Sequence, residues 1–369
     1  MPLNLDPAEA APYLEANTAP APHLDFLTAV AFRTAGAALR LGVFEALADG
    51  PLPAGSVADR TGTDVRGVQL LLEALVSFGY VVRTAGGYAN SPVAARWLRR
   101  DDPDGYATIL SFWHTLVTDL WTDLEQSVRD GVPARDFYTW LDRHPDTLRE
   151  FQSILDRMAG RQADEVVPLV PVPATGGRLL DLGGGHCRYS IAFCLRHPGL
   201  HATVVDSAAP LAIGAAAVAA AGLGDRVTAV AGDFLTADLG QGYDVALLFN
   251  VVHGGTPAQV AGLLRRVAAA LRPGGVAVLL EPLSDHAADA GAAAEAFVRT
   301  FSLHLFHTQG GQVYAAPELS RWLAEAGFGE VRRHRLTGSE IDHLLIAATS
   351  APARPDPAAS VSRPVRRRR

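Results

Sequence analysis

The sequence predicts a doubly wound α/β fold, with a mostly parallel sheet and an antiparallel last strand, preceded by a mainly α winged-helix domain. Three observations support this prediction. Strand and helix patterns alternate over residues 177–350, three consecutive glycines follow the first predicted strand, and helical spacing followed by a hairpin pattern occupies residues 24–98. At 369 residues, the chain is also longer than one compact domain usually is.

Composition and spacing divide the chain into five expected segments. These are a flexible leader at 1–23, a winged-helix domain at 24–104, a helical connector at 105–170, an α/β domain at 171–350 and a disordered Arg-rich tail at 351–369.

The first predicted domain combines helices with a hairpin. Apolar residues recur at helical spacing in residues 23–41, and Asp64 is well placed to begin a further helix. The β-prone residues 80–90 are interrupted by Gly86 and Gly87, as is typical of a hairpin. Helices followed by such a hairpin indicate a winged helix.

A winged helix can bind DNA, but the charges of this chain argue against nucleic acid as a partner. The net charge is −7, and the last nineteen residues hold six Arg and one Asp, which leaves −12 for the rest. In the helix that begins at Asp64, Arg66 is the only cation beside Glu73. We therefore expect the apolar first helix, with Phe26 and Val30, to pack against a second copy of the chain in a homodimer.

The connector at 105–170 has a helical pattern that is rich in aromatic residues. Most of these side chains are expected to pack between the predicted domains. An aromatic connector beside a ligand-binding domain is also a suitable place for an apolar small molecule, so Trp113 and His114 are candidates for lining its pocket.

Near-continuous apolar runs in residues 171–350 predict parallel strands that helices cover on both faces, as in a Rossmann-like sheet. The five runs are Arg178–Leu182, Ala202–Asp206, Val227–Ala231, Tyr243–Phe249 and Val276–Glu281. Two further runs, residues 331–336 and 343–349, are separated by a stretch too short for a helical crossover, so they should pair antiparallel.

The strongest motif lies at the end of the first predicted strand, where Asp181 precedes three glycines. Gly183 and Gly185 permit a sharp turn and let a ligand approach main-chain N–H groups. A dinucleotide fingerprint would need a small residue where Arg188 stands, and the Asp181 carboxylate would repel a pyrophosphate. The same carboxylate suits the amino end of S-adenosylmethionine, or water bound to it.

Acidic residues also follow the next two predicted strands. Asp206 ends the second strand, where a carboxylate can accept hydrogen bonds from both hydroxyl groups of a ribose. After the third strand, Asp233 can accept from an adenine amino group, and Phe234 can pack on the ring. Each acid alone could simply cap a strand end, whereas together they indicate a site for an adenosyl ligand.

With these motifs, nearly all of the chain between leader and tail resembles the class I small-molecule O-methyltransferases, which depend on S-adenosyl-L-methionine and carry an N-terminal winged-helix dimerisation domain. The family's Asp-x-Gly-Gly-Gly loop matches residues 181–185, its ribose-binding acid matches Asp206, and its Gly-Asp-x-Phe/Met element matches residues 232–235. The resemblance implies a general base at His253, after the fourth strand, and a supporting acid at Glu281, at the end of the fifth. It also implies the cofactor and a homodimer.

The resemblance is weaker around the implied base. Gly254 and Gly255 follow His253 where plant-type members have Asp and Trp, and Val313 stands where they have a second supporting Glu. His307 is expected to pack or to line the substrate pocket. The cofactor site is therefore better matched than the acid-base site.

The predicted function is methyl transfer to a hydroxyl group of an aromatic or polyketide-like small molecule of secondary metabolism, with His253 as base. In-line displacement from a sulfonium needs no metal, and a His with a pKa near 6.5 is a suitable acceptor for the proton of a phenol with a pKa of about 10. Methyl transfer to carbon or nitrogen by proximity remains an alternative. More distant alternatives are an NAD-dependent oxidoreductase and a transcriptional regulator that uses the cofactor domain as a sensor.

Cysteine content and hydropathy bear on metal binding and location. Cys187 and Cys194 are too few for a zinc-type centre and are expected to be small buried side chains of one helix. The first sixteen residues lack the basic start and apolar core of a signal peptide, and no apolar run approaches the roughly 20 residues of a membrane span. We expect a cytoplasmic protein with no metal and no membrane partner.

Overall fold

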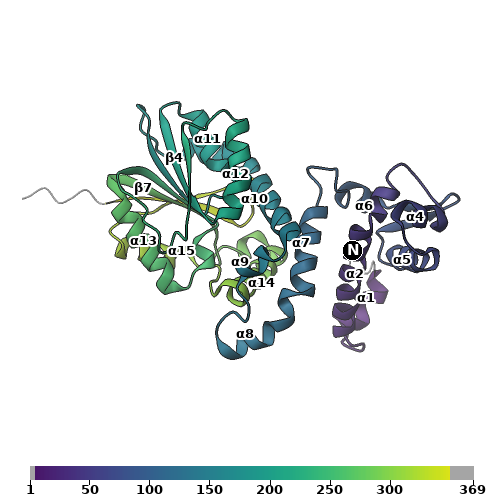
Figure 1. Cartoon of the computed structure of the whole chain (residues 1–369). Coiled ribbons are helices and arrows are strands. Elements are labelled where there is room, and N and C mark those ends of the chain that lie inside the picture. The colour runs from purple at the N-terminus through teal and green to yellow at the C-terminus, as the bar shows by residue number, and fades with distance from the viewer. Residues whose placement is uncertain (1–4, 350–369) are drawn as a thin grey trace, which may run out of the picture. The chain divides into compact units, whose positions relative to one another are not determined.

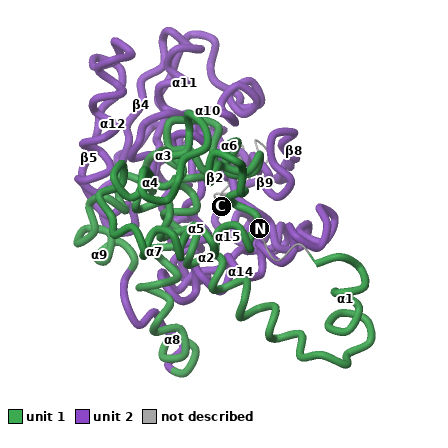
Figure 2. Tube along the Cα trace, turned by 90° about the vertical axis from the view of Figure 1, so that its right-hand side faces the viewer, with its two compact units in different colours: residues 1–129, 137–154 green, residues 130–136, 155–369 purple. Residues whose placement is uncertain are grey.

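The computed structural model of the chain describes residues 5–349 (Figure 1). It divides into two compact units, which Figure 2 colours separately. Unit 1 comprises residues 1–129 and 137–154, and unit 2 comprises residues 130–136 and 155–369. The division falls inside helix α10, so the predicted helical connector contributes to both units.

The first part of unit 1 has the predicted combination of helices and a hairpin, together with a helix, α1, inside the predicted leader. The helices are α1 (Pro7–Leu14), α2 (Pro22–Leu41), α3 (Val43–Ala46), α4 (Ala54–Thr61), α5 (Val65–Ser77) and α6 (Pro92–Trp97), and the hairpin strands are β1 (Val81–Thr84) and β2 (Gly87–Asn90). Asp64 caps α5 as predicted, since its carboxylate accepts a hydrogen bond from the Gly67 N–H at 2.8 Å. All of these elements except α1 pack around one apolar core, which contains Leu39, Phe44 and Leu72.

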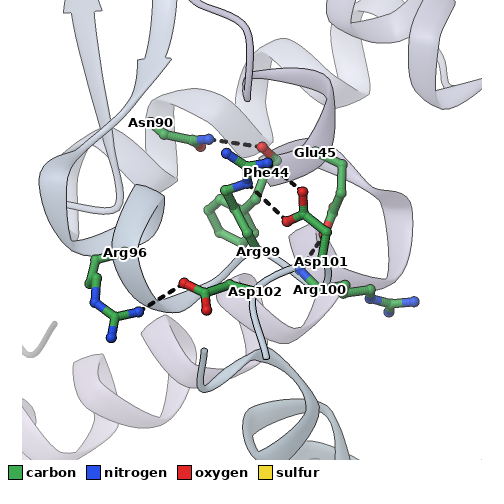
Figure 3. A network of polar contacts seen from close by, with 8 residues as sticks. All are labelled: Phe44, Glu45, Asn90, Arg96, Arg99, Arg100, Asp101 and Asp102. Carbon is green, nitrogen blue, oxygen red and sulfur yellow. Dashed lines mark hydrogen bonds and ion pairs between the residues drawn. The ribbon is translucent and has the colours of Figure 1, made fainter. Parts of the chain in front are cut away.

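Polar contacts tie α3 to the end of this domain (Figure 3). The Asn90 side chain, at the end of β2, donates to the Phe44 carbonyl at 2.8 Å. The Arg100 N–H donates to the Glu45 carboxylate at 3.1 Å. α3 therefore holds both the hairpin and the segment that follows α6.

The predicted flexible leader contains a helix. The Asp6 carboxylate accepts from the Ala8 and Glu9 N–H groups at 2.8 and 2.9 Å, and the Glu9 carboxylate accepts from the Asp6 N–H at 3.0 Å. This capping box begins α1, none of whose residues is buried. Local capping thus orders a segment for which composition alone predicted no structure. The predicted tail at 351–369 lies outside the described residues.

The aromatic connector is helical, as predicted. Its elements are α7 (Ala107–Thr118), η1 (Leu120–Asp123), α8 (Leu124–Asp130), α9 (Phe137–Asp142), α10 (Pro145–Val166) and η2 (Val167–Leu169). Phe112 of α7 stacks on Phe151 of α10 with ring centroids 5.4 Å apart, and Phe137 of α9 meets the same ring edge-on at 5.4 Å. These aromatic side chains join α7, α9 and α10 within unit 1.

The sheet of unit 2 has the strand order β5-β4-β3-β6-β7-β9-β8. Its strands are β3 (Gly177–Leu182), β4 (Leu200–Asp206), β5 (Val227–Ala231), β6 (Tyr243–Phe249), β7 (Leu271–Pro282), β8 (Arg332–Arg335) and β9 (Asp342–Ala348). β5, β4, β3, β6 and β7 are parallel, whereas β9 runs antiparallel to β7 and to β8. The predicted sheet is confirmed, although β7 begins at Leu271 rather than Val276.

Helices cover both faces of this sheet, which makes the fold doubly wound. The covering helices are α10, α11 (Arg188–Arg196), α12 (Ala208–Ala220), α13 (Pro257–Ala270) and α15 (Ala316–Glu325). The unit also contains α14 (Ala292–Gln309) and the short turns η3 (Val252–Gly254) and η4 (Ala288–Ala290). Leu179 of β3 belongs to the apolar core beneath α10, α11 and α12, whereas Leu180 belongs to the core beneath α13 and α15. In Figure 1, α11 and α12 accordingly lie beside β4.

The two cysteines of unit 2 are buried free thiols, but they do not share a helix. Cys187 precedes α11 with a φ of +60°, and Cys194 lies inside that helix. Burial, together with the charges of Asp181 and Asp206, raises the pKa of Cys187 to about 12, so its thiol is uncharged at neutral pH. Among residues 5–349, no helix combines the length and the apolar character that crossing a membrane requires.

Candidate active site

The candidate residues of unit 2 come together along one edge of the sheet. Three acids lie at the carboxyl ends of strands: Asp181 in β3, Asp206 in β4 and Glu281 in β7. Asp233 follows β5, and His253 follows β6. Because these five strands are parallel and adjacent, their carboxyl ends meet at the same edge. The structure thus places the predicted cofactor residues and the predicted base in one row.

Each glycine of the loop after β3 is required by its surroundings. Gly183 has a φ of +70°, which L side chains rarely adopt. A Cβ on Gly184 would lie 2.4 Å from the Asp181 carboxylate, and a Cβ on Gly185 would lie 2.7 Å from Asp206 Oδ2. The loop therefore folds tightly over the two carboxylates. Gly184 was not among the predicted site residues, and its place between two glycines is the signal that could have identified it.

Asp181 is a buried carboxyl group with few partners. It is 2% exposed, and its Oδ2 accepts one hydrogen bond, from the Ser190 hydroxyl at 2.7 Å. Burial raises the pKa of Asp181 to about 7, and the nearby Asp206 charge adds to that rise. A positively charged group beside this carboxyl would stabilise its ionised form.

Asp206 joins the turns after β3 and β4. Its Oδ2 accepts from the Gly185 N–H at 2.9 Å, and its Oδ1 accepts from the Ser207 N–H at 2.6 Å. Burial raises the pKa of Asp206 above its usual value, while these two hydrogen bonds oppose that rise. Each carboxylate oxygen has a second acceptor site, so Asp206 can still accept hydrogen bonds from a ligand.

Asp233 and Phe234 lie in the turn after β5. The Asp233 carboxylate accepts from the Leu235 N–H at 2.8 Å and contacts the Thr236 hydroxyl at 3.2 Å, so it caps this turn locally. Phe234 is half-buried, and its ring edge lies 3.7 Å from where a Cβ on Gly183 would be. The ring therefore borders the glycine loop, whereas the Asp233 carboxylate serves the turn.

His253 is held by Glu281. The His253 Nδ1 lies 2.5 Å from Glu281 Oε2, and Glu281 Oε1 accepts from the Val251 and Val252 N–H groups at 2.8 and 2.9 Å. Glu281 is 1% exposed, so all of these contacts are shielded from water. A carboxylate at Nδ1 keeps the ring proton on that nitrogen, which leaves the Nε2 lone pair available to accept a proton.

Helix α14 lies against the His253 ring. Phe301 meets it edge-on with ring centroids 5.5 Å apart, and Phe301 in turn stacks on His304 at 6.0 Å. Burial, with smaller contributions from His307 and His253, lowers the pKa of His304 to about 3, so this ring is neutral. His307 is also buried, on the same helix. The base thus lies beside the Phe301 ring, which is backed by the neutral imidazole of His304.

Gly254 and Val313, two of the residues that differ from plant-type members, have a structural explanation. A Cβ on Gly254 would lie 2.5 Å from the Gln309 side chain, and a Cβ on Gly311 would lie 2.0 Å from the His253 carbonyl. The turn after His253 therefore packs directly on the chain that follows α14. Val313 is buried in a small apolar cluster with Val298, so no carboxylate occupies that position.

The predicted pocket residues Trp113 and His114 belong to unit 1. His114 is fully buried, and its ring would collide with a Cβ on Gly36, at 2.0 Å. Its nitrogens lie 3.3 Å from Arg33 and 2.8 Å from Arg40, and burial beside these arginines lowers its pKa to about 4. In this structure α2 covers the ring and engages both of its nitrogens, and a pocket-lining role for His114 stays a prediction. Trp113 is half-buried and packs on the aromatic cluster of α7, α9 and α10.

A buried polar chain in unit 2 was not predicted. The Tyr189 hydroxyl donates to Gln162 Oε1 at 2.8 Å, and the Gln162 amide donates to Asp342 Oδ2 at 2.9 Å. Burial raises the pKa of Asp342, and the Glu281 charge adds to that rise. The three residues lie on α11, α10 and β9, so no local sequence pattern could have connected them.

Two family models match the chain: the O-methyltransferase dimerisation domain over residues 26–100 and the O-methyltransferase domain over residues 121–329. The chain is similar to the 3-hydroxy-5-methyl-1-naphthoate 3-O-methyltransferase of Streptomyces sahachiroi, with 30% identity over 82% of this chain and 87% of that protein. It is 28% identical to the tetracenomycin polyketide synthesis 8-O-methyl transferase of Streptomyces glaucescens, over 82% of this chain and 89% of that protein. The solved structure of human N-acetylserotonin methyltransferase in complex with SAM has a similar fold, with a TM-score of 0.73 and 23% identity over 95% of this chain and 100% of that chain.

Proposed function

The chain belongs to the O-methyltransferase family with an N-terminal dimerisation domain, and from this membership we propose that it transfers a methyl group from S-adenosyl-L-methionine to a hydroxyl group on an aromatic or polyketide-like small molecule. The observation that carries this proposal is the row of residues at the carboxyl edge of the sheet. There, a glycine loop over the buried Asp181 and the partly buried Asp206 lies in line with a histidine that a third carboxylate orients.

The residues of the glycine loop suit this cofactor. Asp181, whose carboxyl group has no positively charged partner among the described residues, would hold the amino-acid end of the cofactor through the positive charge of the cofactor's ammonium group. Asp206 would accept from the ribose hydroxyls, and Phe234 would pack on the adenine ring, with Asp233 as a further acceptor beside it. A dinucleotide fits less well, because the same Asp181 carboxylate would face a pyrophosphate.

His253 would act as the general base. When bound, the cofactor supplies the electrophilic methyl group of a sulfonium. His253 Nε2 would take the proton of the acceptor hydroxyl, while Glu281 keeps the other ring nitrogen protonated and stabilises the imidazolium that forms. One carboxylate suffices for this orientation, because Glu281 is itself fixed by two backbone N–H groups.

The acceptor class rests on the relatives and on the surroundings of the base. The names of the two Streptomyces relatives specify a hydroxynaphthoate and the tetracenomycin polyketide. In this chain, the rings of Phe301 and Phe297 stack at 5.7 Å on α14, and the Phe301 ring adjoins His253. An apolar, planar acceptor is the kind of molecule that such rings bind.

We further propose that the protein is a homodimer through α2. The dimerisation model covers this helix, and α2 leaves Phe26 59% exposed and Val30 39% exposed. Exposed apolar side chains on one helix favour an arrangement in which a second copy of the chain buries them. A light-scattering mass of two chains is expected, and a mass of one chain at micromolar concentration would contradict the proposal.

Replacement of His253 tests the assigned chemistry. His253→Ala should lower turnover of a hydroxynaphthoate by about 10²- to 10⁴-fold while the affinity for S-adenosylhomocysteine stays close to that of the wild type. The matched control is His201→Ala, which removes an exposed histidine of β4 and should leave both quantities unchanged. Unchanged turnover in His253→Ala would contradict the assignment of His253 as the base. If mass spectrometry and NMR showed a product methylated on carbon or nitrogen, the proposed transfer to a hydroxyl group would be wrong.

A further inference from the structure

A polar cleft lies at the β8 edge of the sheet in unit 2, where Figure 2 labels β8 and β9 together. Its volume is about 320 Å³, close to the lower end of the range for small-molecule sites. Side chains of β8, β9, the turn between them and the segment after β7 line it: His286, Asp289, Arg333, Arg335, Glu340 and His343. None of these residues belongs to the row that we assign to the cofactor and the base.

Strand pairing brings the cationic side chains to one wall. Arg333 and Arg335 are two residues apart on β8, so they project to the same face. Arg335 is the cross-strand partner of His343 on β9. The His343 ring is 3% exposed and lies 5.1 Å from the His286 ring. Two guanidinium groups and two imidazoles therefore converge on the same space.

The acids of the cleft do not neutralise the two arginines. Asp289 pairs with His286 Nδ1 at 3.1 Å, and the Nε2 of that ring accepts from Arg333 and lies 3.6 Å from the Asp285 carboxylate. Within residues 5–349, no carboxylate oxygen lies within 4.0 Å of the Arg333 or Arg335 guanidinium, and Glu340 makes no ion pair. The wall formed by β8 thus keeps an excess of positive charge.

The protonation of His343 responds to this charge. Burial lowers the pKa of His343, and the positive charges of His286, Arg333 and Arg335 lower it further, against the hydrogen bond from its Nδ1 to the Ile341 carbonyl. His343 therefore experiences a positive potential from His286, Arg333 and Arg335. A bound anion would reduce that potential.

We propose that this cleft binds a small oxyanion, a molecule with a carboxylate or phosphate group, between Arg333 and Arg335. The guanidinium fork matches either group, because it can donate two parallel hydrogen bonds to a pair of oxygens. The limited volume selects small molecules rather than polymers. The site is separate from the methyl-transfer residues, although His343 pairs across the sheet with Glu281.

Titration calorimetry of the full chain with inorganic phosphate and, separately, with citrate tests this site. At least one anion should bind the wild type, and Arg335→Gln should weaken that binding about tenfold or more, since a charge-assisted pair is lost. The matched control is Arg332→Gln, which removes a cation that is also exposed, from the opposite face of the same strand.

The identity of the binding anion distinguishes the two possible groups. Binding of phosphate alone assigns a phosphate site, binding of citrate alone assigns a carboxylate site, and binding of both assigns a general oxyanion site. The proposal is overturned if neither anion binds, or if Arg335→Gln and Arg332→Gln weaken binding equally. Thermal melting of each variant shows that it is folded before the comparison is made.

Discussion

Two carboxyl groups at the ends of β3 and β7 are equally buried but differ in their partners. Asp181 is 2% exposed and accepts one hydrogen bond, from Ser190, and its pKa rises to about 7. Glu281 is 1% exposed, and it contacts the His253 ring and two backbone N–H groups. The first carboxyl lacks a counter-charge, whereas the second has its hydrogen-bonding capacity largely filled.

The difference separates a binding region from a preorganised one. The His253–Glu281 pair holds its geometry through contacts within the protein, as a base must if it is to accept a proton without reorganisation. The glycine loop keeps a carboxyl group whose ionisation would be completed by a cationic ligand. The uncompensated Asp181 carboxyl therefore contributes less to folding stability than to ligand binding. Substitutions at the His253–Glu281 pair and at the glycine loop test this comparison.

The largest effect on turnover is expected when the preorganised His253–Glu281 pair is disrupted. Glu281→Ala removes the contact to His253 and the acceptor for the Val251 and Val252 N–H groups. Turnover should fall by about 10²- to 10⁴-fold, as for loss of a general base. Each stranded N–H should also lower the free energy of unfolding by about 1–3 kcal/mol, measured by urea denaturation.

Glu330→Ala is the control for this change, because Glu330 is exposed and has no partner among the described residues. It should leave turnover and stability unchanged. If folded Glu281→Ala retained wild-type turnover, the orientation of His253 by Glu281 would play no part in the reaction.

A smaller effect is expected on the binding side, from Gly184→Ala. The added Cβ would lie 2.4 Å from the Asp181 carboxylate, so the loop or the carboxyl must move. Overpacking of this kind costs about 1–3 kcal/mol, which corresponds to a roughly ten- to hundredfold loss of cofactor affinity if binding bears the cost. Gly224→Ala, at a position with no atom within 4 Å of the new Cβ, should bind normally. Equal affinities for the two variants would show that the loop tolerates movement.

The smallest effect concerns stability and pH. In the folded protein, the Asp181 carboxyl keeps its proton up to a pH of about 7, whereas the unfolded chain releases it near its ordinary value of 3.8. Stability from this group is therefore present at low pH and is lost as the pH rises from the ordinary value to the raised one. Asp181→Asn does not titrate, so at about pH 8 its melting temperature should exceed that of the wild type, and the gap should narrow toward about pH 5. A gap independent of pH would contradict the raised pKa.

Much of the α/β domain could be predicted from the sequence, because its signals are local. Buried strands such as Tyr243–Phe249 are continuous apolar runs, and the glycines after Asp181 mark a turn that no other residue could form. The site residues at strand ends followed from these strands, since parallel strands bring their carboxyl ends to one edge.

The remainder depends on approaches between distant residues. The link from Tyr189 through Gln162 to Asp342 joins three elements, and the burial of His114 depends on the absence of a Cβ at Gly36. Neither leaves a pattern at neighbouring positions. Composition also did not predict α1, because its capping box depends on the positions of Asp6 and Glu9 and not on how many acids the leader holds.

The central claim is that the glycine loop binds an adenosyl ligand with a cationic amino-acid end beside Asp181. Calorimetry with S-adenosylhomocysteine at about pH 7, in two buffers that differ in ionisation enthalpy, tests it most directly. Wild-type protein should bind and release a fraction of a proton, because the ammonium group lowers the raised pKa of Asp181, and Asp181→Asn should release none. Folded wild-type protein that takes up no ligand would contradict the account.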